Sequence, residues 1–569
     1  MIRYYCDNDH IYTNTSICSK CGQRTRIEGA DIYWCDECNI PIYEEKCGCC
    51  GNEGRRIASD LRPVFPEERL LIEIVLEKAF EFKDKSVWNC AGKYYVNGKK
   101  INFSIKELAN ADTDYIKKEY DRLSPDNDYR YFNEMIGKFV IANARRYSAI
   151  TNEATDYIRE KAAEFEDNEM FVSFSGGKDS TVVSDLVMRA LSKPSILHIF
   201  GDTTLEFDST MEYVDRFKKN HRSTPVLSSR NKEKDFYELM EILGPPSRVM
   251  RWCCTVFKTG AITRKIATLF KDKKRILTFY GIRRSESASR SKYDRESDSP
   301  KITKQIVVSP IIDWFDFDVW LYMLSSGIDF NDAYRLGYAR VGCFCCPNNS
   351  GWSEFVSKVH MKDRMQKFHD ELVEFASKVG KPDPEDYVND GKWKARQGGN
   401  GLEHAKKSIV SFEPCATEEN TFNYELQRPI EEQLYELFKP FGYINKDMGN
   451  KRLGEVYVMG VDGKPKLRLQ GRVGQTTLKV TILDYHIAKA RNIKTAEERI
   501  KCQITKYQMC MGCLACESVC RFNAINIKEQ KDGSISYVID DSKCKRCTEC
   551  VNHFDAGCYM RKVLTIKRK

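Results

Sequence analysis

The sequence predicts a multidomain α/β protein whose central domain is a doubly wound parallel sheet. Three observations indicate this. The apolar run from Met170 to Phe174 is typical of a buried strand, and a glycine turn and a helical pattern, TVVSDLVMRAL, follow it. A second strand-like run, SILHIF, ends at Gly201. Cysteine-rich segments near both ends of the chain have the spacing of small metal-binding domains.

Length and composition allow several domains. The chain has 569 residues, of which 41% are hydrophobic, so about three to five domains can each bury a core. No apolar run approaches 18 residues and MIRYYCDNDH lacks a signal-peptide core, so we expect a soluble, cytoplasmic protein that does not enter a membrane. The expected segments are 1–60 with one or two zinc ribbons, 61–168 as a small α+β domain, 169–380 as the nucleotide domain, 381–407 as a linker, 408–500 as a small α+β domain, and 501–569 as an iron–sulfur domain.

The 24 cysteines favour metal binding or redox chemistry over disulfides, because a long chain without an export signal seldom uses a disulfide framework. The formal charge of +9 does not by itself indicate a nucleic-acid partner. Each site of four thiolates holding zinc or a [4Fe–4S] cluster carries about −2, and several such sites would cancel most of the excess.

Two cysteine sets predict zinc near the N-terminus. Two Cys-x2-Cys knuckles can surround one tetrahedral Zn²⁺, as in a zinc ribbon; their ligands are Cys35, Cys38, Cys47 and Cys50. A second zinc site can use Cys6, His10, Cys18 and Cys21. A ribbon this small has little core, so the metal would supply its folding free energy. Redox-active thiols are the alternative.

Residues 61–168 carry no motif that fixes their role. EERLLIEIVLEKAF has helical periodicity, and Asn97-Gly98 between two strand-like runs predicts a hairpin. A small α+β domain fits this pattern. It could correspond to the PUA-like RNA-binding module found in this position in some multidomain proteins, or it could be a plain packing domain.

The segment Ser175-Gly176-Gly177-Lys178-Asp179-Ser180 predicts an anion-binding loop. The glycines allow close approach of the backbone, the serines offer hydroxyls, and the helix that follows directs free N–H groups and a positive dipole at a phosphate. The spacing differs from the Walker A pattern. It resembles the SGGxDS loop of the PP-loop ATP pyrophosphatases, which split ATP at the α-phosphate and share an adenine nucleotide alpha-hydrolase-like fold. The resemblance implies catalytic roles for Lys178, Asp179, Ser180 and Asp202.

Further segments in the same order are similar to the 3′-phosphoadenylyl-sulfate (PAPS) reductase branch of that family. They begin with Asp202-Thr203-x2-Glu206-Phe207, at the end of the second strand, and include Arg251-Trp252-Cys253-Cys254-Thr255-x2-Lys258, Gly281-x-Arg283-x2-Glu286-Ser287-x2-Arg290 and Pro310-Ile311-x-Asp313-Trp314. The resemblance covers about residues 169–350. It implies nucleotide binding by Asp202, Glu206, Lys258, Arg283 and Arg290 in addition to the glycine loop, with Mg²⁺ as the counter-ion. Guanidinium groups suit phosphate or sulfate oxygens.

This domain contains two adjacent cysteines, Cys253 and Cys254, and a Cys-x2-Cys pair, Cys343 and Cys346. The combination is similar to the iron–sulfur adenylyl-sulfate reductases and implies a third [4Fe–4S] cluster, with zinc as the alternative. Reductases of this branch also end in Glu-Cys-Gly, whose cysteine attacks the sulfonate. No Glu-Cys-Gly occurs in this sequence, so ordinary sulfonucleotide reduction is not the first expectation.

Eight cysteines near the C-terminus resemble a two-cluster bacterial ferredoxin. By that pattern the fourth cysteine of each run serves the other cluster. One [4Fe–4S] cluster would use Cys510, Cys513, Cys516 and Cys558, and the other would use Cys544, Cys547, Cys550 and Cys520. Arg521 takes the place of the usual proline, and the second run is longer than in bacterial ferredoxins.

The combined expectation is an iron–sulfur enzyme that cleaves an adenine nucleotide at the α-phosphate and carries out electron-dependent sulfur transfer, with RNA or DNA as the implied acceptor. The alternative is a reductase of adenylyl sulfate or PAPS supplied by its own ferredoxin domain, and a noncatalytic nucleotide-sensing redox scaffold is a third class. The sequence does not identify the sulfur donor or the electron donor.

Overall fold

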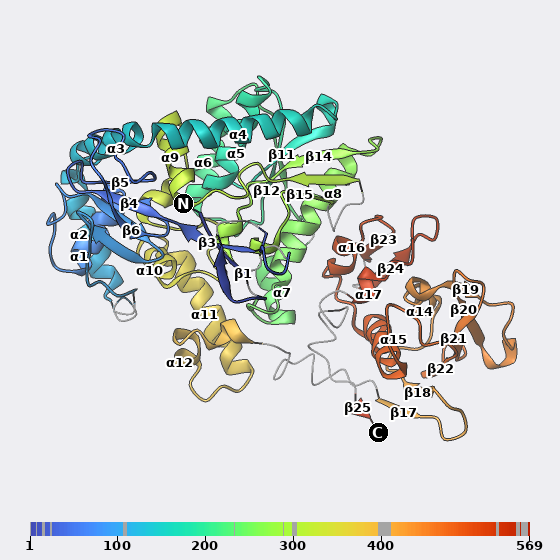
Figure 1. Cartoon of the computed structure of the whole chain (residues 1–569). Helices are drawn as coiled ribbons and strands as arrows, with labels where there is room; N and C mark the ends of the chain where they lie inside the picture. The colour runs from blue at the N-terminus through green and yellow to red at the C-terminus, as the bar shows by residue number, and fades with distance from the viewer. Residues whose placement is uncertain are drawn as a thin grey trace. The chain divides into compact units, whose positions relative to one another are not determined.

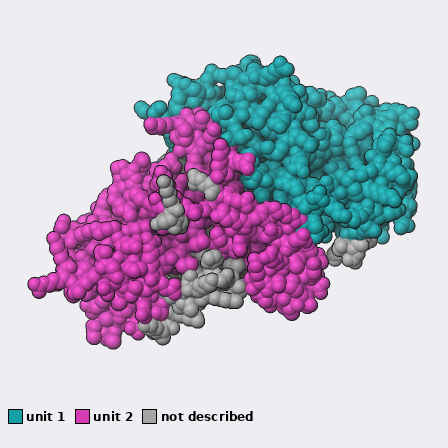
Figure 2. Space-filling view, turned by 180° about the vertical axis from the view of Figure 1, so that it is seen from behind, with its two compact units in different colours: residues 1–228, 272–299, 304–366 teal, residues 229–271, 300–303, 367–569 magenta. Residues whose placement is uncertain are grey.

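The computed structural model describes residues 2–6, 8–13, 17–22, 25–105, 108, 111–232, 234–287, 290–298, 304–396, 411–530, 534–552, 558 and 567–568 (Figure 1). The chain divides into two compact units, coloured separately in Figure 2. Unit 1 comprises residues 1–228, 272–299 and 304–366, and unit 2 comprises 229–271, 300–303 and 367–569. Residues 397–407 of the expected linker lie outside the described residues, and its described part contains α12 (Pro384–Asn389).

Three small sheets form the N-terminal part of unit 1. Their strand orders are β2-β1-β3, β5-β4-β6 and β10-β9-β8-β7. The strands are β1 (Ile2–Cys6), β2 (Ile11–Thr13), β3 (Arg26–Ala30), β4 (Ile32–Cys35), β5 (Ile40–Ile42), β6 (Arg55–Ala58), β7 (Arg62–Pro63), β8 (Val87–Cys90), β9 (Lys93–Val96) and β10 (Lys99–Lys100). Asn97 and Gly98 both have positive φ and connect β9 to antiparallel β10, which confirms the predicted hairpin.

The central sheet has six strands in the order β13-β12-β11-β14-β16-β15. The strands are β11 (Met170–Phe174), β12 (Leu197–Gly201), β13 (Val226–Ser229), β14 (Ile276–Phe279), β15 (Glu296–Asp298) and β16 (Gln305–Val308). β12, β11, β14 and β16 run parallel, and β15 is antiparallel at the edge. The carboxyl ends of the parallel strands therefore meet at one edge of the sheet, where ligands bind in folds of this kind.

The helices of unit 1 supply part of its apolar core. They are α1 (Pro66–Val75), α2 (Thr113–Leu123), α3 (Arg130–Ala142), α4 (Ala144–Ala162), α5 (Lys178–Ala190), α6 (Asp208–Asn220), α9 (Asp316–Ser326), α10 (Gly351–His360) and the first turns of α11 (Lys362–Lys378). α5 packs on β11, and α4 contacts both α5 and α9. One continuous apolar core includes Trp34, Trp88, Val172 and Trp320, so the N-terminal sheets and the central sheet are packed together.

Unit 2 has a seven-stranded sheet in the order β19-β20-β21-β22-β18-β17-β25 and a two-stranded sheet, β23-β24. The strands are β17 (Ser411–Pro414), β18 (Thr421–Glu425), β19 (Tyr443–Asn445), β20 (Glu455–Met459), β21 (Pro465–Gln470), β22 (Thr477–Ile482), β23 (Ile525–Glu529), β24 (Ile535–Ile539) and β25 (Lys567–Arg568). The helices are α7 (Phe236–Leu243), a π-helix (Cys254–Thr259), α8 (Gly260–Leu269), α12, α14 (Glu432–Glu436), α15 (Ile493–Met509), α16 (Ala515–Val519) and α17 (Glu549–Asn552).

The predicted fold class is confirmed: the chain is a mixed α/β multidomain protein with a central, mostly parallel sheet. Among the described helices, none combines the length and the apolar character that crossing a bilayer requires.

Candidate functional site

The glycine loop joins β11 to α5 in a closed turn. Gly176 has φ of +69°, and a Cβ at this position would lie 3.0 Å from Cγ2 of Thr210. The Ser180 hydroxyl accepts a hydrogen bond of 3.1 Å from the Ser175 backbone N–H and donates one of 2.9 Å to the Gly177 carbonyl. The hydroxyls of Ser175 and Ser180 also lie 3.0 Å apart. Ser180 therefore fixes the shape of the loop.

The loop leaves hydrogen-bond donors unused at the start of a helix. Within the described part of the chain, no hydrogen bond uses the backbone N–H of Gly176 or of Gly177. α5 begins at Lys178 and extends over 13 residues, so its positive dipole end lies at these donors. This arrangement can bind a phosphate or a similar anion.

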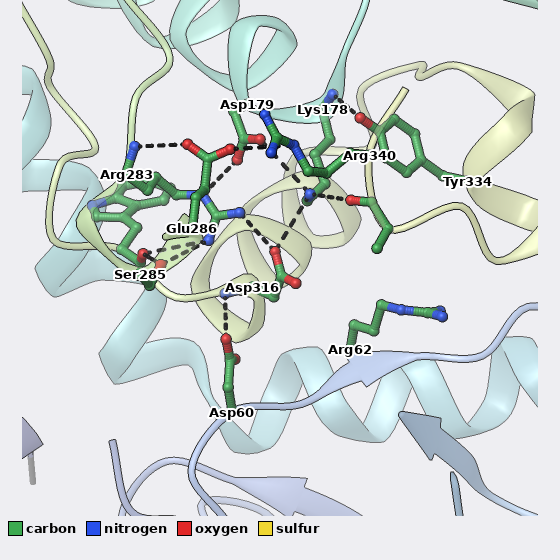
Figure 3. A network of polar contacts seen from close by, with 12 residues as sticks. Asp60, Arg62, Lys178, Asp179, Arg283, Ser285, Glu286, Asp316, Tyr334 and Arg340 are labelled. Carbon is green, nitrogen blue, oxygen red and sulfur yellow. Dashed lines mark hydrogen bonds and ion pairs between the residues drawn. The ribbon is translucent and has the colours of Figure 1, made fainter. Parts of the chain in front are cut away.

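Lys178 is 3% exposed and belongs to a network of buried charges (Figure 3). Its ammonium group donates a hydrogen bond of 2.9 Å to the carbonyl of Ala339 and lies 3.4 Å from Asp316 and 3.7 Å from Asp179. Its backbone N–H donates to the Tyr334 hydroxyl at 2.9 Å. Burial opposes the charge of Lys178, but Asp179 and Asp316 outweigh it and raise the pKa of the ammonium group.

Arg283 connects two acids of this network. Its guanidinium donates to Asp179 at 2.6 Å and to Asp316 at 2.7 Å, and its side chain is buried. Gly281 allows the loop after β14 to approach, because a Cβ there would lie 2.6 Å from the backbone of Asp179. The sequence predicted nucleotide binding by Arg283, and the structure places its donors on carboxylates.

Asp60 reaches this network from the N-terminal sheets and receives the first N–H groups of α9. Its carboxylate accepts hydrogen bonds from the backbone N–H of Asp316 and of Phe317, at 3.0 and 2.9 Å. Burial, with the nearby charge of Asp316, raises the pKa of Asp60 to about 7. Burial also opposes ionisation of Asp316, but Lys178 and Arg283 prevail and lower the pKa of that carboxyl group.

The second predicted arginine, Arg290, is paired with an acid as well. Its guanidinium contacts Glu286, and Arg340 lies 3.9 Å from the same carboxylate. Arg340 is 65% exposed at its side chain, so it is the arginine of this group that remains open to a solvent-borne anion.

The segment after β12 is folded back on itself and contacts one of the predicted cluster ligands. The Glu206 carboxylate accepts hydrogen bonds from the backbone N–H and the hydroxyl of Thr203, and burial raises its pKa. Asp202 accepts a 2.9 Å hydrogen bond from the Thr204 N–H. Glu206 pairs in a short bridge with Cys343, whose thiol lies 3.6 Å from the Thr203 hydroxyl. Cys343 therefore lies near the carboxyl end of β12, at the edge where the parallel strands of the sheet end.

The other predicted ligands of a third cluster belong to unit 2, as does Lys258. Cys253 precedes the π-helix Cys254–Thr259, which also contains Lys258, and this π-helix contacts α16. A Cβ on Gly260 would lie 2.0 Å from the Ser518 hydroxyl, so the glycine permits the approach. Because Cys343 and Cys346 belong to unit 1, the third cluster stays a prediction.

Some of the C-terminal cysteines line a cavity. Four of them surround one cavity with apolar walls, namely Cys520, Cys544, Cys547 and Cys550. Burial raises the pKa of Cys558, and the side chains of Cys502, Cys516 and Cys513 raise it further. The assignment of these cysteines to two clusters stays a prediction. Lys506 is buried and donates to the carbonyl of Cys550 at 2.6 Å, so a cation lies among ligands that become thiolates.

The ribbon cysteines fit a tetrahedral zinc ion. The ligand atoms of Cys35, Cys38, Cys47 and Cys50 all lie within 4.8 Å of one another. The Sγ–Sγ distances are 3.5 Å for Cys35–Cys50 and 3.8 Å for Cys38–Cys47. A Zn–S bond length of about 2.3 Å gives about 3.8 Å between sulfurs at a tetrahedral centre, so the geometry is suitable.

The second N-terminal group differs from the sequence expectation in one ligand. The structure gathers Cys6, Asp9, Cys18 and Cys21 within 4.8 Å, while His10 is exposed and its ring nitrogen lies 3.3 Å from the Tyr5 hydroxyl. The Cys18 thiol donates to the Asp9 carboxylate at 3.1 Å. Asp9 thus takes the position that the sequence analysis gave to His10.

Sequence reasoning missed three residues of the charge network, namely Asp60, Asp316 and Tyr334. Asp316 begins α9 after the Pro310–Trp314 segment, so an acidic residue at a helix start was a usable signal. Asp60 and Tyr334 act through contacts that span 256 and 156 residues, and no local pattern marks them.

Two segments of the chain match known domain families. Residues 169–349 match the phosphoadenosine phosphosulfate reductase domain, and residues 509–553 match the 4Fe-4S dicluster domain. The uncharacterized proteins MJ0066 and MJ0973 of Methanocaldococcus jannaschii are each 32% identical, over 40% and 42% of this chain and 45% and 55% of their own lengths. The chain therefore spans about half the length of these relatives.

An adenosine 5′-phosphosulfate reductase of Staphylococcus epidermidis is 25% identical over 186 residues, which are 32% of this chain and 71% of that protein. Residues 169–349 contain the glycine loop, Cys343 and the residues of the charge network other than Asp60. Residues 169–349 are a PAPS reductase domain, residues 509–553 are a 4Fe-4S dicluster domain, and the N-terminal segment carries a cysteine group suited to zinc.

Proposed function

We propose that this protein binds ATP at the glycine loop, cleaves it at the α-phosphate and transfers sulfur to a nucleic acid in an electron-dependent reaction. One observation carries the proposal: the unused N–H groups of Gly176 and Gly177 lie at the start of α5, in the loop that also carries the hydroxyl of Ser175. These donors suit the pyrophosphate portion of a nucleotide.

The residues of the loop would act on the leaving group. The acceptor's oxygen forms a bond to the α-phosphorus while the bond to pyrophosphate breaks, and Lys178 and the helix start stabilise the negative charge that pyrophosphate takes away. A sulfur atom delivered from a persulfide, whose S–S bond breaks as it takes up two electrons from the electron donor, would then bond to the activated atom, and AMP would leave with the oxygen. Asp179 follows the loop and Asp202 follows β12. Their carboxylates are oxygen ligands of the kind that Mg²⁺ requires.

The contact between α16 and the π-helix supports an electron path within unit 2. α16 carries Cys516, a predicted cluster ligand, and the π-helix carries Cys254. Iron–sulfur clusters, when bound, supply one-electron transfer at thiolate ligands. The chain's contribution is to hold the two cysteine segments against each other.

A reductase of adenylyl sulfate is the second candidate. The similarity to adenosine 5′-phosphosulfate reductases favours it, and so does the position of Cys343 beside the nucleotide edge of the sheet. The absence of a Glu-Cys-Gly sequence favours the first candidate, because no cysteine then has the context of the sulfonate-attacking thiol.

Product analysis separates the two candidates. Anaerobically prepared holoprotein is incubated with ATP or with adenylyl sulfate, and pyrophosphate and sulfite are measured. The proposal predicts pyrophosphate from ATP, with a loss of at least about tenfold in Asp179→Asn and Ser180→Ala and no loss in the control Ser377→Ala on the surface of α11. Sulfite from adenylyl sulfate without ATP, together with no pyrophosphate, would instead establish the reductase.

A further inference from the structure

Lys506 is a buried cation in the cysteine-rich part of unit 2. It lies on α15, four residues before Cys510, and only 1% of its surface is exposed. α15 contacts α17, the short helix that carries Cys550, and α17 contacts α16, which carries Cys516 (Figure 1). α15 therefore leads directly into the first cysteine run and packs against the second.

Two hydrogen bonds connect Lys506 to both predicted cysteine sets. Its backbone carbonyl accepts a 3.0 Å hydrogen bond from the N–H of Cys510, which belongs to one set. Its ammonium group donates a 2.6 Å hydrogen bond to the carbonyl of Cys550, which belongs to the other. One residue thus holds a segment of each set, and its side chain brings a positive charge to them.

No carboxylate balances this charge. Among the described residues, none of the aspartates and glutamates lies within ion-pair distance of the Lys506 ammonium group. Two other lysines of unit 2 with side chains only 8% exposed differ in this respect. Lys501 lies 2.9 and 3.4 Å from two glutamates, and Lys234 lies 2.8 and 3.4 Å from two others. A fully buried lysine without a counter-ion is rare and costly, so an anion is expected close to Lys506.

Cysteine side chains around Lys506 can supply that negative charge. Burial opposes the charge of Lys506, but four neighbouring cysteines outweigh it and raise the pKa of the ammonium group. They are Cys516, Cys502, Cys550 and Cys558. Cys516 and Cys558 belong to one predicted set and Cys550 to the other, so thiols of both sets lie within reach of the same cation.

The cysteine sets suit groups of the required charge. Four of these cysteines line one cavity, as described above. A [4Fe–4S] cluster held by four thiolates carries a charge of about −2, and about −3 after it takes up one electron. A nearby positive charge stabilises the more negative, reduced form and so raises the reduction potential. This Coulomb interaction acts across buried space and needs no open surface at Lys506.

We propose that Lys506 is the shared counter-ion of the two C-terminal clusters and raises the reduction potentials of both. A low-potential one-electron carrier gives one electron to each cluster, no covalent bond changes, and Lys506 keeps its proton. Lys506 is thus a positioning residue that acts through the clusters. The inference rests on the iron–sulfur part of the proposed function and not on the cleavage of ATP.

Three substitutions separate the charge of Lys506 from its hydrogen bond. Lys506→Gln removes the charge and keeps an N–H donor for the Cys550 carbonyl, and Lys506→Arg keeps both. The control is Lys501→Gln, because Lys501 is a buried lysine of the same helix that already has its own carboxylates. Each full-length protein is prepared anaerobically and its iron is counted. Electron paramagnetic resonance of samples poised with dithionite and redox mediators gives the midpoint potentials of the two clusters.

The proposal predicts that one-electron reduction of both clusters becomes about tenfold less favourable in Lys506→Gln, which corresponds to a fall of about 59 mV in each midpoint potential. Lys506→Arg and Lys501→Gln should stay within about twofold of the natural protein. A change below about twofold in Lys506→Gln would overturn the inference, and so would a change at one cluster alone.

Iron content decides the case in which Lys506→Gln does not hold its clusters. About eight iron atoms in Lys506→Arg would then show that the positive charge is what the clusters require. Loss of iron from both variants would show that only the shape of the lysine side chain matters, and would overturn the inference. Pyrophosphate release separates this result from the proposed function. Shifted potentials without pyrophosphate from ATP keep the role of Lys506 and remove the ATP pyrophosphatase proposal, while pyrophosphate with unshifted potentials does the opposite.

Discussion

Arg283 donates a hydrogen bond of 2.6 Å to Asp179, although 104 residues separate them in the chain. The bond joins the loop after β14 to the second residue of α5, and the same guanidinium continues to Asp316 at the start of α9. Three segments of the PAPS reductase domain are thus fixed around the glycine loop by one buried cation.

Removing that cation should destabilise the domain. Arg283→Ala removes the hydrogen-bonded cation of Asp179 and Asp316 and leaves them Lys178 as their cationic neighbour, and the expected loss in the free energy of unfolding is about 3 kcal/mol. Thermal unfolding of the holoprotein measures it. The control is Arg284→Ala, because Arg284 pairs with Asp313, which is 46% exposed, and such a pair is worth less than about 1 kcal/mol. Equal effects of the two substitutions would contradict the network's importance.

The ribbon zinc site gives a prediction with a neighbouring control. Cys38→Ser removes one of four gathered thiols, and the zinc content should fall by about one ion per chain, with partial unfolding of the ribbon. Cys49 lies outside this group and is exposed, so Cys49→Ser should keep all of its zinc. Elemental analysis by mass spectrometry reads both; unchanged zinc in Cys38→Ser would refute the assignment.

The second N-terminal cysteine group gives a prediction that distinguishes Asp9 from its neighbour His10. Asp9 lies with the three thiols and His10 does not, so Asp9→Ala should weaken metal binding at this group and His10→Ala should leave it unchanged. Competition with a colorimetric chelator measures the affinity. The opposite order of the two variants would restore the histidine ligand that the sequence suggested.

Cys90 should respond to the charge of Asp60. Burial raises the pKa of the Cys90 thiol, and the Asp60 carboxylate raises it further. Asp60→Asn removes a negative charge, so the pKa of Cys90 should fall and the pH profile of its alkylation should move to lower pH. Hydrogen bonds from Thr417 lower the pKa of Cys415. Cys415 should therefore be alkylated faster than Cys90 in both proteins. A profile that does not move would show that Asp60 and Cys90 do not interact.

The C-terminal cysteines predict about eight iron atoms per chain in two clusters. Cys520→Ser should lose one cluster, about four iron atoms, because Cys520 lines the cavity with the cysteines of the second run. Cys502 is buried on α15 and lies outside the predicted ligand sets, so Cys502→Ser should retain its iron. Iron analysis with electron paramagnetic resonance of the reduced protein distinguishes the variants.

Local patterns predicted the parts of the site that depend on neighbouring residues. The glycine loop, the hairpin at Asn97-Gly98 and the ribbon knuckles are short segments whose residue types specify their geometry. The predicted arginines show the limit of this reasoning. A sequence marks Arg283 as a donor for oxygen anions, but whether the anion is a ligand or a carboxylate such as Asp179 depends on packing between distant segments. The position of Asp60 depends on the same kind of long-range contact.

The most direct test of the account follows the α-phosphorus of ATP. Holoprotein is incubated with Mg²⁺ and ATP labelled at the α-phosphate, together with short single-stranded RNA or DNA oligonucleotides, and the labelled products are separated by chromatography. The account predicts labelled AMP from the natural protein and a strong loss of it in Ser180→Ala, whose loop lacks the hydroxyl that closes it. Labelled ADP in place of AMP, or equal AMP from both proteins, would contradict it.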